Sequence, residues 1–247
     1  MIKKIKALRH QIKAIIQENS DNQKKMLLQS QELEWAHVYH DSIRGKQWLD
    51  VLPLNIGRWA GNYSFFYVLN RILNDFKPKA ILELGLGEST KFVTTYLDNY
   101  LIDSKHLVIE QDENWKNIFK ENFKVSKRTE IIVCPLEKTI VKGFETNAYH
   151  NFEQAVKGEF DLYLIDGPFG SSHYSRYDIM KLANNFEPEN QFIIVMDDYN
   201  RQGEKETIAD LISLFKSKNI KVYHNSYTGN KSAMVIATEK YKYATSF

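Results

Sequence analysis

Acidic side chains stand at the ends of four apolar runs in this chain. They are Glu83, Glu110, Asp166 and the adjacent pair Asp197 and Asp198. A carboxylate can accept hydrogen bonds from neighbouring hydroxyls, attract a cationic group, remove a proton or bind a hard metal ion. Two adjacent acids after a buried run are costly unless they are solvated, paired or metal-bound. These carboxylates are therefore the first candidates for chemistry.

Two glycines follow the first of these acids. The segment ELGLG (83–87) contains Gly85 and Gly87, and Ser89 and Thr90 come close behind it. Glycine lets the backbone turn sharply and lets a ligand approach without meeting a Cβ atom, while Ser89 or Thr90 can cap a following helix. A dinucleotide-binding turn would have a third glycine where Thr90 stands. The segment is a candidate ligand turn, and a dinucleotide is not the ligand it favours.

Glu110 ends the next apolar run and is followed by Gln111. One carboxylate at this place can accept hydrogen bonds from two neighbouring hydroxyls, such as those of a ribose. Dehydrogenases share the feature, so Glu110 alone does not distinguish between nucleotide ligands. Alternatively, Glu110 only caps the next helix, although Asp112 is better placed for that role.

The elements that must position these residues follow a regular pattern from residue 79 onward, where short apolar runs alternate with amphipathic segments. This alternation is typical of βα units on a parallel sheet. The predicted strands are 80–84, 106–110, 130–134, 160–166, 191–197, 220–226 and 232–238. The predicted helices are 88–98, 113–123, 150–157, 174–186 and 203–218.

The last two predicted strands are joined by the short segment YTGNK (227–231), which is typical of a hairpin. The seventh strand should therefore run antiparallel to its neighbour. The predicted fold class is α/β, with a doubly wound, Rossmann-like, seven-stranded sheet in the domain 79–247. A helical N-terminal extension (1–50) and a covering segment with a helix (51–78) precede it.

Residues 1 to about 35 predict a helix, because Ile5, Leu8, Ile12 and Ile15 are spaced by three or four and no Gly or Pro interrupts them. This apolar seam has three interpretations. The helix packs on its own domain, or it is an arm through which the protein forms homo-oligomers, or it is a basic helix on a membrane surface. The membrane interpretation is the weakest, because the seam lacks Trp or Phe anchors.

Bulk properties exclude several classes of function. Thirty-three basic and 31 acidic residues give a net charge of +2, which offers no field for steering a nucleic acid. The single cysteine, Cys134, allows no internal disulfide, so we expect a cytoplasmic protein. No apolar run is long enough for a transmembrane helix or a signal peptide.

Four segments resemble class I S-adenosylmethionine (SAM)-dependent methyltransferases, and a bacterial group of them in particular. They are ELGLGES (83–89), EQDENW (110–115), DLYLIDGP (161–168) and DDYNR (197–201). The terminal hairpin resembles that fold as well. The resemblance implies that SAM is bound by Glu83, Gly85, Gly87, Ser89, Glu110, Gln111 and Asp166, with Glu83 near the methionine moiety and its ammonium group.

The reaction is indicated by the segment that begins at Asp166. It is not the NPPY or DPPY motif of amino-methylating enzymes, so the favoured acceptor is a hydroxyl oxygen of a small molecule or glycan. Methyl transfer needs in-line alignment and removal of the acceptor's proton. Asp166 or Asp198 is the candidate base, and His173 is a second candidate. Alternatively, His173 is a surface residue without a role in the site.

Asp166, Asp197 and Asp198 also resemble, in placement, the magnesium-binding residues of catechol and caffeoyl-coenzyme A O-methyltransferases. Asp198 stands where those enzymes have Asn. Oxygen ligands suit a hard divalent ion such as Mg²⁺. The competing interpretation is that Asp197 hydrogen-bonds the loop, with Arg201 as a salt partner.

Two other functions remain compatible with the sequence. A non-catalytic protein that binds a nucleotide or SAM is disfavoured by the presence of Glu83, Glu110 and Asp166 together. A nicotinamide-dependent oxidoreductase is disfavoured by the missing third glycine. Further candidate site residues are Tyr174, Arg176 and Tyr177 for the acceptor pocket, and Arg58, Trp59, Asn62 and Tyr63 for a cover over the cofactor.

Overall fold

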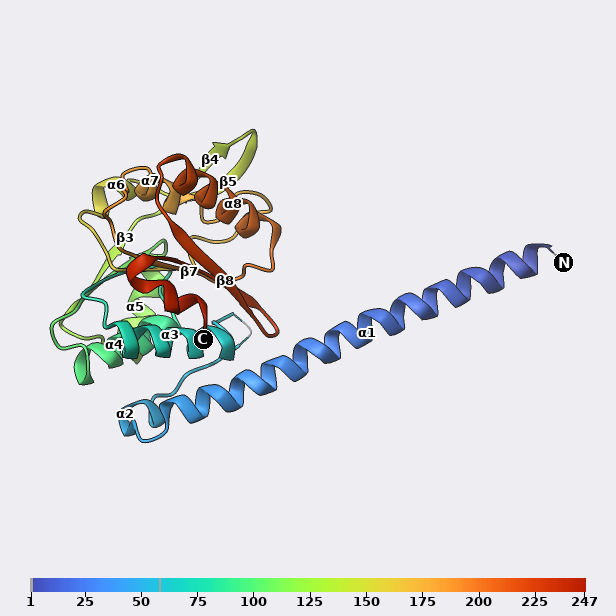
Figure 1. The fold of residues 1–247 in the computed structure, drawn as a ribbon, viewed down its shortest axis with the longest axis horizontal. Helices are drawn as coiled ribbons and strands as arrows, with labels where there is room; N and C mark the ends of the chain where they lie inside the picture. Colours follow the sequence, from blue (N-terminus) through green and yellow to red (C-terminus); the bar gives the residue numbers. More distant parts are fainter. Residues whose placement is uncertain (1, 58) are drawn as a thin grey trace.

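The protein, seen here as a computed structural model, consists of an α/β body and a long helix that extends from it (Figure 1). The structure describes residues 2–57 and 59–247, and the side chains of residues 2–5, 7 and 8 are not among those described. The body is built on a seven-stranded sheet with the strand order β3-β2-β1-β6-β7-β9-β8. Arg58, one of the predicted cover residues, lies outside the described residues.

All seven predicted strands are present, with ends shifted by at most a few residues. They are β1 (Ala80–Leu84), β2 (Lys105–Glu110), β3 (Thr129–Val133), β6 (Leu162–Ile165), β7 (Ile193–Met196), β8 (Val222–Thr228) and β9 (Ser232–Thr238). The last strand, β9, lies between β7 and β8 and runs antiparallel to both. The predicted antiparallel seventh strand is therefore confirmed.

The chain first steps outward from β1 to β3 and then returns to place β6 on the other side of β1. Leu84, the last residue of β1, pairs with Ile165, the last residue of β6, in parallel register. The segments that leave these two strands therefore begin side by side at the carboxyl edge of the sheet, where ligands bind in doubly wound folds.

Helices cover both faces of the sheet. Their bounds are α2 (Gln47–Asp50), α3 (Tyr63–Arg71), the π-helical turn η1 (Ile72–Phe76), α4 (Glu88–Asn99), α5 (Glu113–Asn122), α6 (Phe152–Ala155), α7 (Asp178–Ala183), α8 (Gln202–Ser217) and the 3₁₀ helix η2 (Glu239–Thr245). Phe66 of α3 and Phe92 of α4 belong to the core on one face. Phe152 of α6 and Phe215 of α8 belong to the core on the other face.

Two predicted helices are shorter than expected. The segment 150–157 forms only α6, and 174–186 forms only α7. Tyr174 and Arg176 have φ angles of 45° and 58°, which a right-handed helix does not allow. The turn that holds Arg176 in this conformation brings its side chain to the sheet edge, where Nη1 donates to the carbonyl of Asp197 at 2.7 Å.

A second, two-stranded sheet was not predicted. It pairs β4 (Leu136–Val141) with β5 (Phe144–Tyr149) in antiparallel register. Side chains of β4 alternate between exposed and half-buried, so the strand lacks the continuous apolar run of the main sheet. Lys142 and Gly143 at its turn both have positive φ angles, as a tight hairpin requires.

The N-terminal helix α1 spans Ile2–Ile43 and is longer than predicted. Its C-terminal part belongs to the core: Tyr39 and Ile43 are buried, and Trp35 packs against the same cluster. Its N-terminal part extends away from the body (Figure 1). No helix among the described residues is both long enough and apolar enough to cross a membrane. The division into 1–50, 51–78 and 79–247 stays a prediction.

Candidate active site

The turn after β1 is held in place by close backbone contacts. Gly85 has a φ angle of 100°, and a Cβ atom there would lie 3.0 Å from the backbone nitrogen of Gly167. Its own N–H donates to the carbonyl of Ile109 at 2.8 Å. Gly87 differs, because a Cβ there would meet nothing within 4 Å. Gly85 is thus required by the packing of the turn, whereas Gly87 leaves open space beside it.

Two adjoining cavities open at this edge of the sheet. The larger has a volume of about 550 Å³ and the smaller about 330 Å³. Both are lined by Leu86, Trp115 and Asp166. The larger is completed by Asn55, Ile56, Gly57, Trp59, Ala60, Gly61, Gly87, Glu88 and Ser89, and the smaller by Gly85, Glu110, Gln111, Asp112, Gly167, Pro168 and Phe169. The three shared residues therefore mark where the two cavities adjoin.

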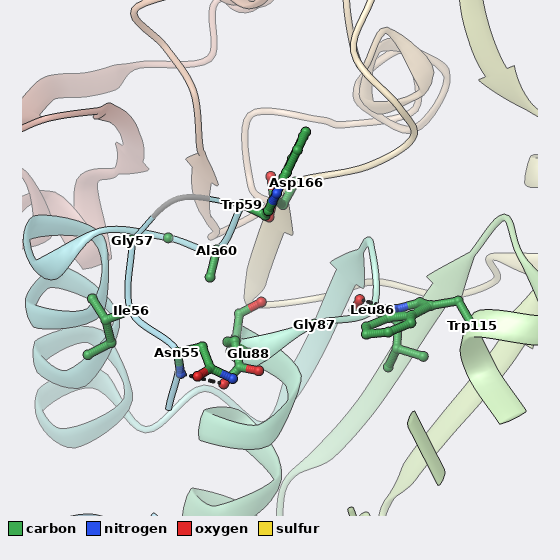
Figure 2. A pocket seen from close by; sticks show the side chains of 12 residues that line it. Asn55, Ile56, Gly57, Trp59, Ala60, Leu86, Gly87, Glu88, Trp115 and Asp166 are labelled. Atoms are coloured by element: carbon green, nitrogen blue, oxygen red, sulfur yellow. Dashed lines mark hydrogen bonds between the residues drawn. The ribbon is translucent and has the colours of Figure 1, made fainter. Parts of the chain in front are cut away.

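Figure 2 shows the larger cavity, with Asn55, Gly57 and Ala60, from the segment before α3, facing the turn after β1. The backbone N–H of Asn55 donates to Oε2 of Glu88 at 3.0 Å, which ties this segment to the start of α4. Trp115 lies at the other end of the view, and its indole Nε1 donates to the carbonyl of Leu86 at 2.8 Å. Trp59 is 95% exposed. The side chain of Trp115 therefore has a fixed place in the site, whereas that of Trp59 stands free in solvent.

Glu110 is buried beside the smaller cavity. Its Oε2 accepts a hydrogen bond from the Leu86 N–H at 2.9 Å. Its Oε1 accepts from the N–H groups of Gln111 and Asp112 at 2.7 and 2.9 Å. Burial raises the pKa of Glu110 in spite of these three bonds. Because each carboxylate oxygen has two lone pairs, Oε2 still has room for a ligand's hydroxyl.

The helix-capping role that Glu110 might have had is filled by Asp112. Its side chain accepts hydrogen bonds from the N–H groups of Asn114 and Trp115 at the start of α5. Gln111 closes the other wall of the smaller cavity, because its Oε1 accepts the N–H of Phe169 at 3.0 Å. Glu110 and Gln111 thus both line the cavity beside the glycine turn.

Glu83 is buried behind the residues that line the cavities. It is 1% exposed, the hydroxyl of Ser89 donates to its Oε1, and Nε2 of the buried His106 lies 2.9 Å from its Oε2. Among the described residues that line the two cavities, Ser89 is present and Glu83 is not. Glu83 therefore reaches the site only through Ser89.

The three aspartates converge as their positions in the sequence predict. Asp166, Asp197 and Asp198 each offer an oxygen, and these oxygens lie within 4.8 Å of one another. Only Asp166 lines the cavities, and its side chain is 30% exposed. Burial raises its pKa to about 7, and the Asp197 charge adds to the rise while the Arg176 guanidinium opposes it.

Side-chain cations already neutralise the cluster. Nη2 of Arg176 lies 2.9 Å from Asp166 Oδ1 and 2.7 Å from Asp198 Oδ2. Nζ of Lys231 lies 2.8 Å from Asp197 Oδ2 and 3.0 Å from Asp198 Oδ1. Although burial acts to raise it, the charges of Arg176 and Lys231 hold the pKa of Asp198 below its usual value. Asp198 is thus a poor proton acceptor compared with Asp166.

A divalent metal ion does not fit these residues as they stand. An ion bound between Asp197 and Asp198 would have to displace Lys231, and an ion bound between Asp166 and Asp198 would have to displace Arg176. Arg201 adds a further cation, with Nη1 at 3.0 Å from Asp198 Oδ2. The geometry therefore matches the interpretation without a metal ion, in which Arg201 is a salt partner. The acid that Arg201 contacts is Asp198.

His173 lies apart from the cavities. Its Nδ1 is 3.0 Å from Oε1 of Glu206 on α8, and its ring stacks on Phe144 of β5. The hydroxyl of Tyr177 donates to Asp210, also on α8. Neither residue is among the described residues that line the two cavities. The catalytic role of His173 therefore stays a prediction, and its side chain contacts Glu206 outside the cavities.

Two residues that sequence reasoning missed hold the site together. Lys231 comes from the turn between β8 and β9, which the antiparallel register places beside the residues that follow β7. Glu32 of α1 accepts hydrogen bonds from Tyr63 N–H, Asn62 Nδ2 and Asn230 N–H at 2.7–2.8 Å. The predicted hairpin register could have pointed to Lys231, whereas no pattern in the sequence singles out Glu32.

No protein-family model and no curated protein matches this chain. Solved structures do match it. The O-methyltransferase TomG from Streptomyces achromogenes, in complex with SAM, has 9% identity over 87% of this chain and 98% of its own, with a TM-score of 0.47. The O-methyltransferase from Bacillus cereus, in complex with S-adenosylhomocysteine (SAH), has 14% identity over 82% of this chain and 91% of its own, with a TM-score of 0.46.

The methyltransferase PaMTH1 from Podospora anserina, bound to SAH, has 11% identity over 90% of this chain and 96% of its own, with a TM-score of 0.41. Identities and scores at this level support no transfer of function. The fold assignment rests on the strand order of the chain itself, with the antiparallel β9 between β7 and β8.

Proposed function

We propose that this protein is a SAM-dependent methyltransferase that methylates a hydroxyl oxygen of a small molecule or glycan. One observation carries the proposal. A buried carboxylate, Glu110, and a carboxylate whose pKa burial raises to about 7, Asp166, line two cavities that adjoin at the glycine turn. SAM is a nucleoside that carries a charged amino-acid chain. It needs adjoining cavities of this kind, with a carboxylate at one end that accepts hydrogen bonds from its ribose hydroxyls.

In this proposal the smaller cavity holds the nucleoside and the larger cavity holds the methionine part. Glu110 accepts the ribose hydroxyls, and Trp115 provides an aromatic face at the boundary between the cavities. Gly87 leaves room for the ligand in the larger cavity, and Ser89, oriented by Glu83, offers a polar group there. The carbonyl of Leu86 is occupied by Trp115, so the turn keeps its shape whether or not a ligand is bound.

When bound, SAM supplies an activated methyl group, so the residues of this chain need only align the acceptor and remove its proton. Asp166 lies at the boundary of both cavities and is the candidate base. Its pKa of about 7 suits the role, because a base works best when its pKa is near the operating pH. Arg176 holds the carboxylate in place through its contact with Oδ1.

Calorimetry with SAM and with NAD tests the cofactor, and release of S-adenosylhomocysteine tests turnover. We expect binding of SAM and none of NAD. Glu110→Gln should weaken SAM binding about tenfold or more, since it removes a charge-assisted hydrogen bond. Glu113→Gln is the matched control, because this neighbouring acid of α5 is exposed and lines neither cavity, and its SAM affinity should stay within about threefold of wild type. Binding of NAD without SAM would refute the proposal.

We also propose that a second copy of the chain packs on the free part of α1. Ile12, Ile15, Met26 and Leu33 are 47–68% exposed and follow a heptad spacing. With two such helices antiparallel, Ile15 faces Met26 of the other copy and Asn19 faces Asn22. The asparagines would then pair with each other at the centre of the seam.

Cysteine pairs test this packing. The double variant Ile15→Cys, Met26→Cys should form a disulfide-linked dimer on mild oxidation, whereas Ile15→Cys alone should not, because equal positions lie about 16 Å apart in the antiparallel pair. Light scattering should give the mass of two chains. A monomer that binds anionic vesicles would instead support the membrane interpretation and refute self-association.

We propose the cytoplasm as the location of the protein. Its single cysteine, Cys134, is a buried free thiol, which is compatible with a reducing compartment.

A further inference from the structure

Lys231 is the only residue of the turn between β8 and β9 that reaches the carboxylate cluster in the part of the chain that the structure describes. Its side chain is 14% exposed, and its Nζ contacts three oxygens. These are Asp197 Oδ2 at 2.8 Å, Asp198 Oδ1 at 3.0 Å and the carbonyl oxygen of Ala60 at 3.2 Å. The ammonium therefore sits among oxygens only, as a bound cation would.

The charges around this ammonium are almost balanced. Asp166, Asp197, Asp198 and the fully buried Glu204 are four acids, and Arg176, Arg201 and Lys231 are three bases in contact with them. If all are ionised, the cluster has a net charge of −1. Loss of the lysine would leave −2 around a group of converging oxygens. That is the charge and the ligand type that a divalent ion prefers.

Lys231 also joins the cluster to the wall of the larger cavity. Ala60, whose carbonyl accepts from Nζ, lines that cavity. The two parts of this wall segment, residues 55–57 and 59–61, are joined by the N–H of Gly57, which donates to the carbonyl of Gly61 at 2.9 Å. Next to it, Asn62 donates from Nδ2 to the backbone carbonyl of Lys231 at 3.2 Å. The turn and the wall segment are thus tied by both the side chain and the backbone of Lys231.

We propose that Lys231 is a built-in cation. It takes the place of a divalent ion between Asp197 and Asp198, and through Ala60 it anchors the cavity wall formed by residues 55–57 and 59–61. Lys231 is a positioning residue, because it acts on the site through the carboxylates and the wall. This inference goes beyond the proposed function and does not depend on it, since it is tested without SAM.

The metal half of the proposal is tested with Mn²⁺ alone, measured by electron paramagnetic resonance and calorimetry. Wild type should bind no Mn²⁺ at the cluster. Lys231→Ala should bind one ion per chain, roughly tenfold or more tightly than any residual binding by wild type. Lys231→Arg should gain nothing, because it keeps the charge. Lys221→Ala, which removes an exposed lysine paired with Glu239, controls for loss of one positive charge elsewhere.

The anchoring half is tested by hydrogen exchange of the wall segment. Exchange in residues 55–61 should become severalfold faster in Lys231→Ala and stay unchanged in Lys221→Ala. If Lys231→Ala does not fold, the variant Lys231→Met is used in its place, because methionine keeps the aliphatic stem without the charge. Stoichiometric Mn²⁺ binding by wild type, or none by the folded variants without a charge at position 231, would overturn the first half. Unchanged exchange in these folded variants would overturn the second.

Discussion

Glu110 and Asp198 are both buried acids at the carboxyl edge of the same sheet, but their charges are satisfied in different ways. Glu110 accepts three backbone N–H groups, from Leu86, Gln111 and Asp112. Asp198 contacts three side-chain cations, Arg176, Lys231 and Arg201. Backbone donors leave the carboxylate of Glu110 with its full charge and a free lone pair, so it can still bind a ligand. The cations around Asp198 leave it little capacity for one.

The two regions can be called the amide-satisfied side, around Glu110 and the glycine turn, and the cation-satisfied side, around Asp197 and Asp198. Asp166 lies between them: it lines both cavities and contacts Arg176. The difference teaches that buried acids at one sheet edge need not share a role. The amide-satisfied side is arranged to bind, and the cation-satisfied side is arranged to hold the cavity wall and Asp166 in place.

The largest expected effect concerns the residue between the two sides. Asp166→Asn removes the candidate base but keeps the size of the side chain, so kcat should fall about 10²- to 10⁴-fold. SAM affinity should change much less, because Glu110 and the glycine turn remain. Single-turnover rates and SAM titrations measure the two separately. A variant with normal kcat would show that the proton leaves by another route, and Asp166 would then belong to the cation-satisfied side.

Arg176→Met should cause the next largest effect, on folding. This fully surrounded guanidinium contacts Asp166 and Asp198, and its loss leaves two carboxylates with one cation fewer. Removal of one partner of a buried ion pair costs about 3–5 kcal/mol of unfolding free energy. Arg201→Met is the control, since the Arg201 side chain is 49% exposed and its loss should cost about 1 kcal/mol or less. Equal losses in urea denaturation of the two variants would contradict the assignment of Arg176 as the central cation.

The two glycines sharpen the comparison on the amide-satisfied side. Gly85→Ala should destabilise the fold by about 1–3 kcal/mol, because its φ angle of 100° and its contact with Gly167 both exclude a Cβ atom. Gly87→Ala should change stability by about 0.5 kcal/mol or less, because its Cβ would meet nothing. SAM affinity should fall in Gly87→Ala, where the new methyl group enters the larger cavity. Thermal denaturation with and without SAM distinguishes the loss of stability from the loss of affinity. Unchanged SAM affinity in Gly87→Ala would mean that SAM does not bind beside Gly87.

The amide-satisfied side could largely be predicted from the sequence, because its parts are local. The glycine turn follows one strand, Glu110 ends the next, and Asp112 caps the helix behind it, as expected from the chain order alone. The parallel register of β1 and β6 then brings Asp166 to the turn. The exception is Glu83, whose side chain points to His106, a contact between neighbouring strands that no motif indicates.

The cation-satisfied side could be predicted only in part. The convergence of Asp166, Asp197 and Asp198 follows from strand ends, so it was expected. Their neutralisation was not, because Arg176 depends on a left-handed turn and Lys231 on the register of a hairpin from the far end of the chain. Side-chain ion pairs between distant segments leave no periodic signal in a sequence. The helices α6 and α7 were predicted but are shorter than expected, because irregular turns replace their expected ends.

Activity should depend on pH through Asp166. A general base works in its deprotonated form, and burial raises the pKa of this carboxyl to about 7. kcat should therefore fall about eightfold from pH 7 to pH 5.8 and level off above pH 8, given one ionisation. The inflection should vanish in the residual activity of Asp166→Asn. An inflection near pH 4 in wild type would mean that Arg176 dominates and that Asp166 behaves like the acids of the cation-satisfied side.

The smallest expected effect is that of a chelator. If Lys231 and Arg176 neutralise the carboxylates in place of a metal ion, an excess of EDTA should leave the activity of wild type within about twofold, and added Mg²⁺ should not raise it. Lys231→Ala provides the contrast. Its carboxylate cluster lacks the lysine, so EDTA should lower its activity and added Mg²⁺ should raise it. Loss of wild-type activity in EDTA with recovery in Mg²⁺ would require the lysine to move aside during turnover. Both sides of the site would then bind a ligand during turnover, and only in the free protein would the carboxylates of the cation-satisfied side be neutralised by Lys231.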